Sequence, residues 1–213
     1  MLSEWRYDPL YSAGWSVERM FDETDVVDTA GEEIGDVENI IFSDDGRVLS
    51  VIAEVGGVWD IGDTHVSIPW EEARLSEDGT RLTVPVTEDN VDDYSVFEKK
   101  SSFFQTDTED IAKVEDDLAT GTTVFKATDL MGDYAYLSEN TRYGYVTDMI
   151  VNNGTISAVI VDAAAYGRPG FYAYPYYGYN AAPSYYPRYN LPYAADEIDV
   201  LENFDYDQLR SQS

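Results

Sequence analysis

The chain has 213 residues, of which 42 are acidic and 13 are basic, and its formal net charge is −29 at pH 7. A surface this acidic repels nucleic acid and anionic lipid headgroups, so we expect no nucleic-acid partner. The sequence has no cysteine and one histidine, which excludes disulfides, thiolate metal sites and a two-histidine zinc site.

The first residues predict an aromatic arm that leads into a short helix. The arm covers residues 1–14 and carries Trp5, Tyr7 and Tyr11. Ser16 is a typical N-cap residue for the helical turn that follows. The arm lacks the basic start and apolar core of a signal peptide, and the sequence has no run of 18 apolar residues, so we expect no direct membrane span. We therefore expect a cytoplasmic protein, or a processed mature chain from the periplasm or envelope.

Residues 34–55 predict a β-hairpin on which the rest of the unit is built. Its Asp-Gly turn ends at Gly46, and glycine supplies the positive φ that a tight turn needs. In the second strand the odd-numbered residues 49–55 fall on one face and the even-numbered residues 48–54 on the other. We expect the first face to be buried and the second, mixed face to be half-exposed.

The residues after the hairpin continue the β pattern. Glycines predict a corner over residues 56–63, and residues 65–70 predict a strand that ends at Pro69. Residues 75–86 predict a second hairpin with its turn at Gly79. Short strands separated by closely spaced turns predict a small antiparallel β-barrel or sandwich.

An acidic segment follows the predicted barrel. Residues 88–117 carry 11 acidic side chains among 30 positions, with no glycine or proline, and we assign a linker to residues 101–122. Apolar residues from Ile111 to Leu118 keep helical spacing, which predicts a short helix over residues 108–119 that packs on a barrel.

The hairpin pattern returns 109 residues later, at residues 143–162, with an Asn-Gly turn. We interpret the chain as two copies of one unit. A proline followed by an aromatic residue ends a strand in each copy, and we match Pro192 to Pro69. The distance from the hairpin glycine to this proline is 34 residues from Gly35 and 48 from Gly144, which predicts an insertion of about 15 residues in the second copy.

The predicted insertion, residues 163–191, differs in composition from the rest of the chain. No acidic residue occurs from Ala163 to Ala195, and the stretch from Tyr166 to Tyr193 holds ten tyrosines. Glycine and proline at this density predict a loop without regular helix or long strand. Because closure entropy grows only with the logarithm of loop length, we expect the loop to be dispensable for folding. Exposed tyrosines in this number would promote aggregation unless something covered them, so we also expect the loop to be needed for partner binding.

Tyrosine offers a large amphipathic contact area at low entropic cost, and arginine can stack on it. The predicted partner-binding residues of the loop are Arg168, Phe171, Tyr172, Tyr174, Tyr176, Tyr177, Tyr179, Tyr185, Tyr186 and Arg188. The alternative, which the composition leaves open, is that the loop covers an apolar patch of its own barrel.

The sequence from Gly31 to Trp70 resembles a PRC-barrel domain. The shared pattern is a glycine-rich start, a hairpin, a Gly-Gly corner and a strand that ends in Pro-aromatic. Matching residues are Gly31, Ile34, Gly35, Val37, Gly46, Gly56, Gly57, Ile61, Gly62, Val66, Ile68 and Pro69. The second copy resembles the family at residues 126–132, 143–151 and 191–193, but it lacks the Gly-Gly corner.

The resemblance implies an all-β fold of bacterial type. It consists of two small antiparallel PRC-barrel-like β-barrels, at residues 15–100 and 123–213, joined by an acidic linker with a short helix. The family includes the cytoplasmic domain of the photosynthetic reaction-centre H subunit and a ribosome-maturation factor. Its members serve mainly as interaction and assembly modules, which implies a protein that is not an enzyme.

No motif marks a catalytic residue, a cofactor site or a metal site. We interpret His65 as a structural or surface histidine. The turn at Asp44 and Asp45 lacks the ligand spacing of a calcium loop, although weak cation binding by exposed carboxylates stays open. The glycines of residues 56–63 are not followed by the Lys-Ser/Thr and helix of a phosphate-binding loop.

We therefore expect a non-enzymatic protein-binding or assembly module. Its partner would be another protein, in a membrane-associated complex, including a photosynthetic one, or in an envelope complex, and a homo-oligomer is also compatible. One alternative is an enzyme or binding protein for a sugar or other small polar ligand, with tyrosine stacking and catalytic carboxylates. Another is a salt-adapted structural protein.

Overall fold

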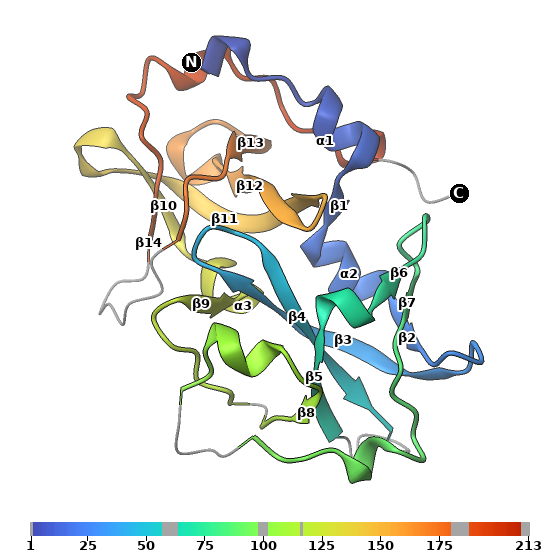
Figure 1. The fold of residues 1–213 in the computed structure, drawn as a ribbon. Helices are drawn as coiled ribbons and strands as arrows, with labels where there is room; N and C mark the ends of the chain where they lie inside the picture. Colours follow the sequence, from blue (N-terminus) through green and yellow to red (C-terminus); the bar gives the residue numbers. More distant parts are fainter. Residues whose placement is uncertain (1, 57–63, 98–101, 116, 180–187, 210–213) are drawn as a thin grey trace.

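The computed structural model describes residues 2–56, 64–97, 102–115, 117–179 and 188–209, and two β-sheets dominate it (Figure 1). The strands of the eight-stranded sheet are β2 (Asp25–Val27), β3 (Glu33–Ser43), β4 (Val48–Val55), β5 (Thr64–Pro69), β6 (Arg74–Leu75), β7 (Arg81–Thr83), β8 (Ala112–Lys113) and β9 (Val124–Lys126). The strands of the six-stranded sheet are β1 (Trp15–Ser16), β10 (Tyr134–Leu137), β11 (Thr141–Asn152), β12 (Thr155–Asp162), β13 (Phe171–Pro175) and β14 (Arg188–Asn190).

The helices are short and lie at the ends of strands. The α-helices are α1 (Asp8–Ala13), α2 (Val17–Glu23) and α3 (Ala127–Leu130). Single 3-10 turns occur at Leu2–Glu4, Trp70–Glu72, Val91–Asp93, Gln105–Thr108, Ser138–Asn140, Ala164–Tyr166, Ile198–Val200 and Tyr206–Gln208. Among the described residues, no helix has the length and apolar character needed to cross a bilayer.

The three predicted hairpins are confirmed, and in the one at residues 75–86 β6 pairs antiparallel with β7. β3 pairs with β4 and β11 pairs with β12, each antiparallel. Gly46 and Gly154 hold positive φ angles of 90° and 71° in the two turns. The predicted helix cap is also confirmed, because the hydroxyl of Ser16 accepts a hydrogen bond from the Arg19 amide at 3.1 Å. The predicted corner at residues 56–63 lies outside the described residues, apart from Gly56.

The two hairpins share the same internal geometry. A Cβ atom on Gly35 would lie 1.8 Å from the backbone oxygen of Glu54, and one on Gly144 would lie 2.0 Å from that of Asp162. Glycine is therefore required at both positions by close approach of the neighbouring strand. Both strands also shift register just beyond these glycines, between residues 37 and 39 in β3 and between residues 146 and 148 in β11.

The third strand of each half shows that the predicted alignment of the two copies is wrong. β5 pairs with β4 so that Pro69 lies opposite Ser50, and β13 pairs with β12 so that Pro175 lies opposite Ala158. Ser50 and Ala158 hold equivalent places in their hairpins, because their partners are Ile41 in β3 and the corresponding isoleucine of β11. The counterpart of Pro69 is therefore Pro175 and not Pro192.

The last strand of each half completes the corrected alignment. β7 runs parallel to β2, and β14 runs parallel to β10. Beyond these strands the Val84 amide donates to the β2 backbone at 2.9 Å, and the Leu191 amide donates to the β10 backbone at 2.7 Å. Pro192 is therefore the counterpart of Pro85, and the two halves have nearly equal length, with no insertion in the second.

The predicted loop over residues 163–191 is thus wrong for its central part. Residues Phe171–Pro175 form a strand, since their alternating aromatic and small side chains suit a pleated, buried surface. The glycines and prolines lie around this strand, with Pro175 at its last position. The structure argues against the expectation that the stretch is dispensable for folding, because β13 belongs to the sheet.

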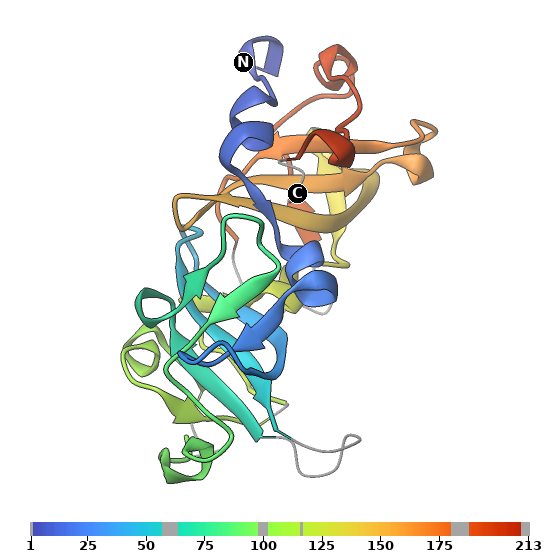
Figure 2. The same ribbon diagram turned by 90° about the vertical axis from the view of Figure 1, so that its right-hand side faces the viewer.

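Neither sheet closes into a barrel among the described residues. The first runs in the order β6-β7-β2-β3-β4-β5-β8 with β9 beside β3, and the second in the order β13-β12-β11-β10-β14 with β1 beside β11. The prediction of two closed barrels is therefore wrong, and the fold is mostly β with two open sheets stacked one above the other (Figure 2).

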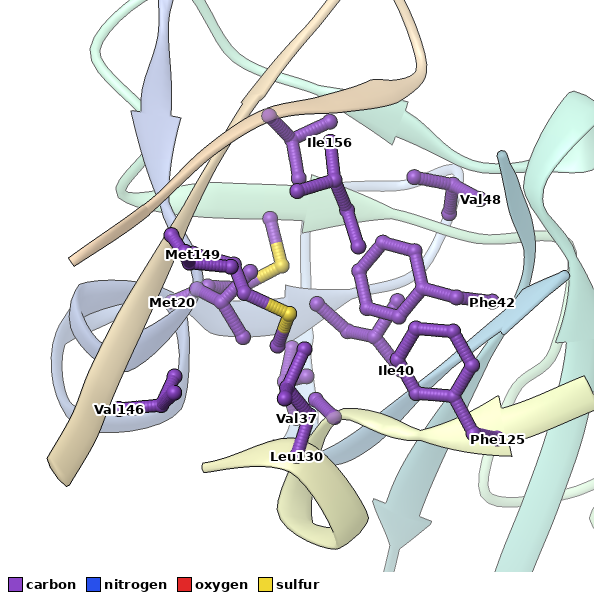
Figure 3. Packing of buried hydrophobic residues seen from close by; sticks show 14 of the residues in the cluster. Met20, Val37, Ile40, Phe42, Val48, Phe125, Leu130, Val146, Met149 and Ile156 are labelled. Atoms are coloured by element: carbon purple, nitrogen blue, oxygen red, sulfur yellow. The ribbon is translucent and has the colours of Figure 1, made fainter. Parts of the chain in front are cut away.

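Each half gives a strand and a helix to the other. β1 pairs with β11 of the second half, and β9 pairs with β3 of the first, while α2 and α3 follow these two strands. The apolar side chains of both halves consequently form one core, in which Met20 of α2 and Met149 of β11 lie close together (Figure 3). The rings of Phe42 and Phe125 stack at 5.6 Å in the same core.

The acidic linker covers the first sheet, as expected, but without the predicted helix over residues 108–119. The chain there makes a 3-10 turn at Gln105–Thr108 and the short strand β8, which pairs with β5. Phe103 and Leu118 pack against Ile52 on the outer face of the hairpin. This contact buries the face of β4 that was expected to be half-exposed, so that prediction is also wrong.

Candidate interaction face

The structure divides the predicted partner-binding residues into buried and exposed ones. Tyr172 and Tyr174 lie on β13 and are 6% and 0% exposed. The hydroxyl of Tyr174 donates to that of Tyr143 at 2.7 Å, and burial raises the pKa of Tyr174, which keeps its hydroxyl protonated. These two tyrosines form part of the core and offer no contact surface.

Tyr176 and Tyr179 connect the two halves of the molecule. The Tyr176 hydroxyl donates to the backbone oxygen of Asp44 at 3.0 Å, in the turn of the first hairpin. The Tyr179 hydroxyl donates to the Asp133 carboxylate at 2.9 Å, and its ring meets Phe125 edge-on at 4.9 Å. Loss of solvent around Asp133 raises the pKa of that carboxyl to about 6. Both tyrosines therefore stabilise internal contacts.

Arg168 holds the C-terminal segment against the second sheet. Its guanidinium donates to the backbone oxygens of Ile198 at 3.0 Å and Leu201 at 3.3 Å. The same group lies 4.3 Å from the ring centroid of Tyr172. Arg168 thus stacks on a tyrosine, as a predicted binding residue would, but it binds the chain's own backbone.

The remaining predicted residues are exposed or lie outside the described part of the chain. Phe171 is 38% exposed, Tyr177 is 52% exposed, and Arg188 is also exposed. Tyr185 and Tyr186 lie outside the described residues. Partner binding by these residues remains a prediction. Among the predicted residues that the structure describes, three have exposed side chains that a partner could contact.

Phe171 and Arg188 stand at opposite ends of one row that crosses the second sheet. Residues that are direct partners across neighbouring strands share a face of the sheet. The row consists of Arg188, Tyr134, Tyr145, Asp162 and Phe171, on β14, β10, β11, β12 and β13 respectively. We call these five residues the aromatic row.

The two tyrosines at the centre of the row are exposed and ordered by an arginine. Tyr134 and Tyr145 are 37% and 36% exposed, and their ring centroids are 4.8 Å apart. The guanidinium of Arg142 lies 3.8 Å from the centroid of Tyr134 and donates a hydrogen bond to the hydroxyl of Tyr145. Stacking of this kind holds both rings in one arrangement before any partner arrives.

The equivalent row of the first half has a different chemistry. It consists of Arg81, Asp25, Asp36, Glu54 and His65, on β7, β2, β3, β4 and β5 respectively. We call these five residues the acidic row. At the two central positions the first half has aspartates where the second half has tyrosines, so the fold does not itself require aromatic side chains there.

The aromatic row has the composition of a protein-binding surface. Among the described residues, Tyr134, Tyr145 and Phe171 all belong to the small set of large apolar or aromatic side chains that are exposed. Tyrosine and arginine are enriched at protein interfaces, where they supply most of the residues that dominate the binding energy. The row lies in a chain of net charge −29 but carries an arginine at one end and Arg142 over its centre.

A cavity of about 580 Å³ lies between the two ends of the chain. Trp5, Tyr7 and Tyr11 line it together with the carboxylates of Asp8 and Glu202. The hydroxyl of Tyr7 donates to the backbone oxygen of Glu202 at 3.0 Å, so the aromatic arm is fastened to the C-terminal segment. The volume is sufficient for a small polar ligand.

Sequence reasoning located the two ends of the aromatic row and missed its centre. The residues at the centre precede the stretch without acidic residues, so its unusual composition gives no indication of them. They are Tyr134, Arg142 and Tyr145. A signal was present in the repeat. Aligning the copies from their hairpin glycines sets Tyr145 against Asp36, a change from a carboxylate to a ring at an exposed strand position.

Comparison with known proteins identifies one family. Residues 21–91 match the model of the PRC-barrel domain, and this confirms the resemblance inferred from the glycine and proline pattern. No curated protein matches the chain. The matched residues include the whole acidic row, whereas the aromatic row lies outside them.

Proposed function

From the premise that residues 21–91 are a PRC-barrel domain, we propose that this protein is a non-enzymatic module that binds another protein through the aromatic row. PRC-barrel domains suggest a protein-interaction module in general terms. The observation that carries the finer proposal is the pair of exposed tyrosines, Tyr134 and Tyr145, ordered by Arg142 on an open sheet face.

The chemistry of the row specifies the partner's surface. The exposed rings of Tyr134, Tyr145 and Phe171 match an apolar patch of a protein. The guanidiniums of Arg142 and Arg188 match carboxylates at its edge, since a charged rim sets orientation and association rate. A partner with an apolar centre and acidic rim fits this face better than a nucleic acid, which the charge of −29 repels. We propose that the partner belongs to a membrane-associated complex, including a photosynthetic one, or to an envelope complex.

The experiment compares two variants that differ only in which half they change. The test variant is Tyr134→Ser with Tyr145→Ser. The matched control is Asp25→Ser with Asp36→Ser, at the equivalent positions of the first half. Proteins that co-purify with the wild-type chain from its host are quantified, and the strongest candidate is produced pure for a direct binding measurement.

We expect the purified partner to bind the wild-type chain and the control variant, and to bind the test variant on the order of tenfold or more weakly. A photo-reactive amino acid at position 145 should then cross-link to the partner, while one at position 36 should not. Equal binding by the test and control variants, with both folded by thermal unfolding, would show that the row is not the contact surface.

A second function is favoured by one observation, the cavity of about 580 Å³ lined by Trp5, Tyr7, Tyr11, Asp8 and Glu202. Aromatic rings beside carboxylates suit a sugar or another small polar ligand, either as a binding site or as an enzyme site. Saturation-transfer NMR with a set of mono- and oligosaccharides tests it, with Trp5→Ala as the variant that should lose the signal. A salt-adapted structural protein is the third alternative, and the salt dependence described below bears on it.

A further inference from the structure

Two residues of the acidic row form, with a neighbouring glutamate, a group of side chains that the proposed function does not use. Glu54 on β4 and His65 on β5 are direct cross-strand partners, and Nε2 of His65 lies 3.9 Å from Oε2 of Glu54. Glu38 lies on β3 beside them. Each of the three residues offers one potential ligand atom, and these atoms all lie within 4.8 Å of one another.

The spacing is close to that of a bound first-row metal ion. Metal–ligand distances of about 2.0–2.2 Å place neighbouring ligand atoms roughly 3.0–3.5 Å apart in tetrahedral or octahedral geometry. The three atoms therefore need to move by only about 1 Å to share one ion, which rotation of the glutamate side chains can supply. A cation among them would also offset the repulsion between the two carboxylates.

The backbone holds the three positions in place. Glu54 and His65 belong to a continuous antiparallel ladder between β4 and β5, and Glu38 sits at the register shift of β3 between Val37 and Asn39. The Val114 amide donates to the backbone oxygen of His65 at 2.9 Å, which fixes the other edge of β5. Ligands on neighbouring strands keep their relative geometry better than ligands on a loop.

Exposure is graded across the group. The side chain of His65 is 14% exposed and that of Glu54 is 33% exposed, whereas Glu38 is exposed. An ion would thus be partly shielded from water on the histidine side and reachable from solvent on the Glu38 side. Three protein ligands leave further coordination positions for water.

The second half of the molecule supplies an internal comparison. At the register positions equivalent to Glu38, Glu54 and His65 it has Thr147, Asp162 and Phe171. The fold accommodates both sets, so neither the glutamate at the register shift nor the histidine is needed to build the sheet. The fold therefore does not require these three residues. What distinguishes them is that they bring together one imidazole and two carboxylates, which are groups that bind metal ions.

We propose that Glu38, Glu54 and His65 bind one divalent transition-metal ion of the Zn²⁺ type. The imidazole nitrogen favours Zn²⁺, Co²⁺ or Ni²⁺ over Mg²⁺ and Ca²⁺, which prefer sites made of oxygen alone. The proposal concerns the first half and is independent of partner binding by the aromatic row.

The test is a calorimetric titration of the full chain with Zn²⁺ at high NaCl and in excess Mg²⁺, so that the many other carboxylates are screened and occupied. The variants are His65→Gln and Glu38→Gln, and the control is Asp162→Asn, the equivalent carboxylate of the second half. We expect one Zn²⁺ per chain. Loss of a residue that hydrogen-bonds to a metal ligand typically lowers the metal affinity about 10–100-fold. Loss of a direct ligand should therefore lower the Zn²⁺ affinity at least about tenfold.

A second measurement is independent of affinity. His65 is the single histidine of the sequence, so its ring protons give one identifiable set of NMR signals. Addition of Co²⁺ should shift or broaden these signals at one equivalent, and less so in the Glu38→Gln variant, whose exposed position leaves the fold intact. Zn²⁺ binding that is unchanged by His65→Gln and Glu38→Gln, or histidine signals that do not respond to Co²⁺, would overturn the proposal.

Discussion

The hydroxyl of Ser16 donates a hydrogen bond of 2.6 Å to the carboxylate of Asp148, which lies 132 residues later in the chain. This bond joins the strand-helix unit of the first half to the second sheet. A matching bond runs the opposite way, from the Asn39 amide group to the Thr128 hydroxyl at 2.9 Å. Asn39 and Asp148 hold equivalent places, each immediately after the register shift of its strand. The two halves therefore exchange equivalent elements, and the same strand position in each half hydrogen-bonds to the strand-helix unit that the other half contributes.

Neither half should fold alone. Fragments 1–121 and 122–213 each lose the strand that the other half supplies, and each exposes one side of the shared core. We expect the separate fragments to be unfolded or aggregated and the co-expressed pair to form a stable complex. Circular dichroism and thermal unfolding of each fragment alone and of the pair would check this. A cooperative melting transition in either isolated fragment would contradict it.

The chain should become more stable as the pH falls from 7.5 to about 5. Asp148 is fully buried, and loss of solvent raises its pKa to about 6, against the hydrogen bonds from Ser16, Glu18 and Met149 that lower it. A carboxyl whose pKa is higher in the folded state binds its proton more tightly there. Its favourable contribution is complete below the pKa of the unfolded chain and is lost as the pH rises through about 6. Asp133 contributes with the same sign.

The measurement is the unfolding free energy of the wild type and the Asp148→Asn variant as a function of pH. The variant should have a smaller pH dependence, by on the order of 1–1.5 kcal/mol over this range, because it lacks the titrating group. The remaining dependence comes from Asp133 and from the general relief of repulsion on protonation. Parallel curves for the two proteins would show that Asp148 does not titrate in this range.

Stability should rise with added salt. At a net charge of −29, repulsion among carboxylates opposes the compact state, and salt screens it. We expect the melting temperature to increase from low to about molar NaCl, where the screening length is roughly 3 Å. Urea titrations at the same salt concentrations separate this effect from salt-driven aggregation. A melting temperature that stays flat or falls would contradict the prediction and weaken the hypothesis of a salt-adapted structural protein.

Tyr174→Ala should destabilise the protein severely. The ring is fully buried and its hydroxyl donates to that of Tyr143, so truncation leaves a cavity and removes this hydrogen bond. Loss of a large buried aromatic side chain costs about 3–5 kcal/mol. Tyr177→Ala is the matched control from the same acid-free stretch. It is 52% exposed, and its loss should cost about 1 kcal/mol or less. Equal effects would mean that the stretch is not part of the core.

Alanine at Gly35 or Gly144 should also disrupt the fold. The added methyl group would meet the backbone oxygen of the neighbouring strand, at Glu54 or Asp162, well inside contact distance. Backbone shifts of this kind cost about 1–3 kcal/mol or more. Gly31→Ala is the control, since nothing lies within 4 Å of its added carbon and only its φ of 84° opposes substitution, at about 1–2 kcal/mol. Chemical denaturation of the three variants provides the comparison.

The sequence by itself determined the local structure of the first half. The hairpin at residues 34–55, the cap at Ser16 and the strand ending at Pro69 depend on glycine conformation, side-chain hydrogen bonding and a missing amide donor. These are properties of single residues and their neighbours, so a pattern in the chain is sufficient to reveal them. The PRC-barrel resemblance came from the same residues.

Tertiary structure alone decided which segments pair. Pro192 was matched to Pro69 because both precede an aromatic residue, yet strand register assigns Pro175 to that place. The helix expected over residues 108–119 gave way to β8, because β5 offers an open edge and the hairpin face offers an apolar surface there. Both outcomes depend on contacts between distant segments.

The candidate site follows the same division. Composition pointed to Phe171 and Arg188 through the absence of acidic residues around them. It could not join them to Tyr134 and Tyr145, since those four residues come from four strands and meet only through sheet pairing. It likewise gave no sign that His65 faces two glutamates. A cross-strand row is a property of register, and register is settled when the strands assemble.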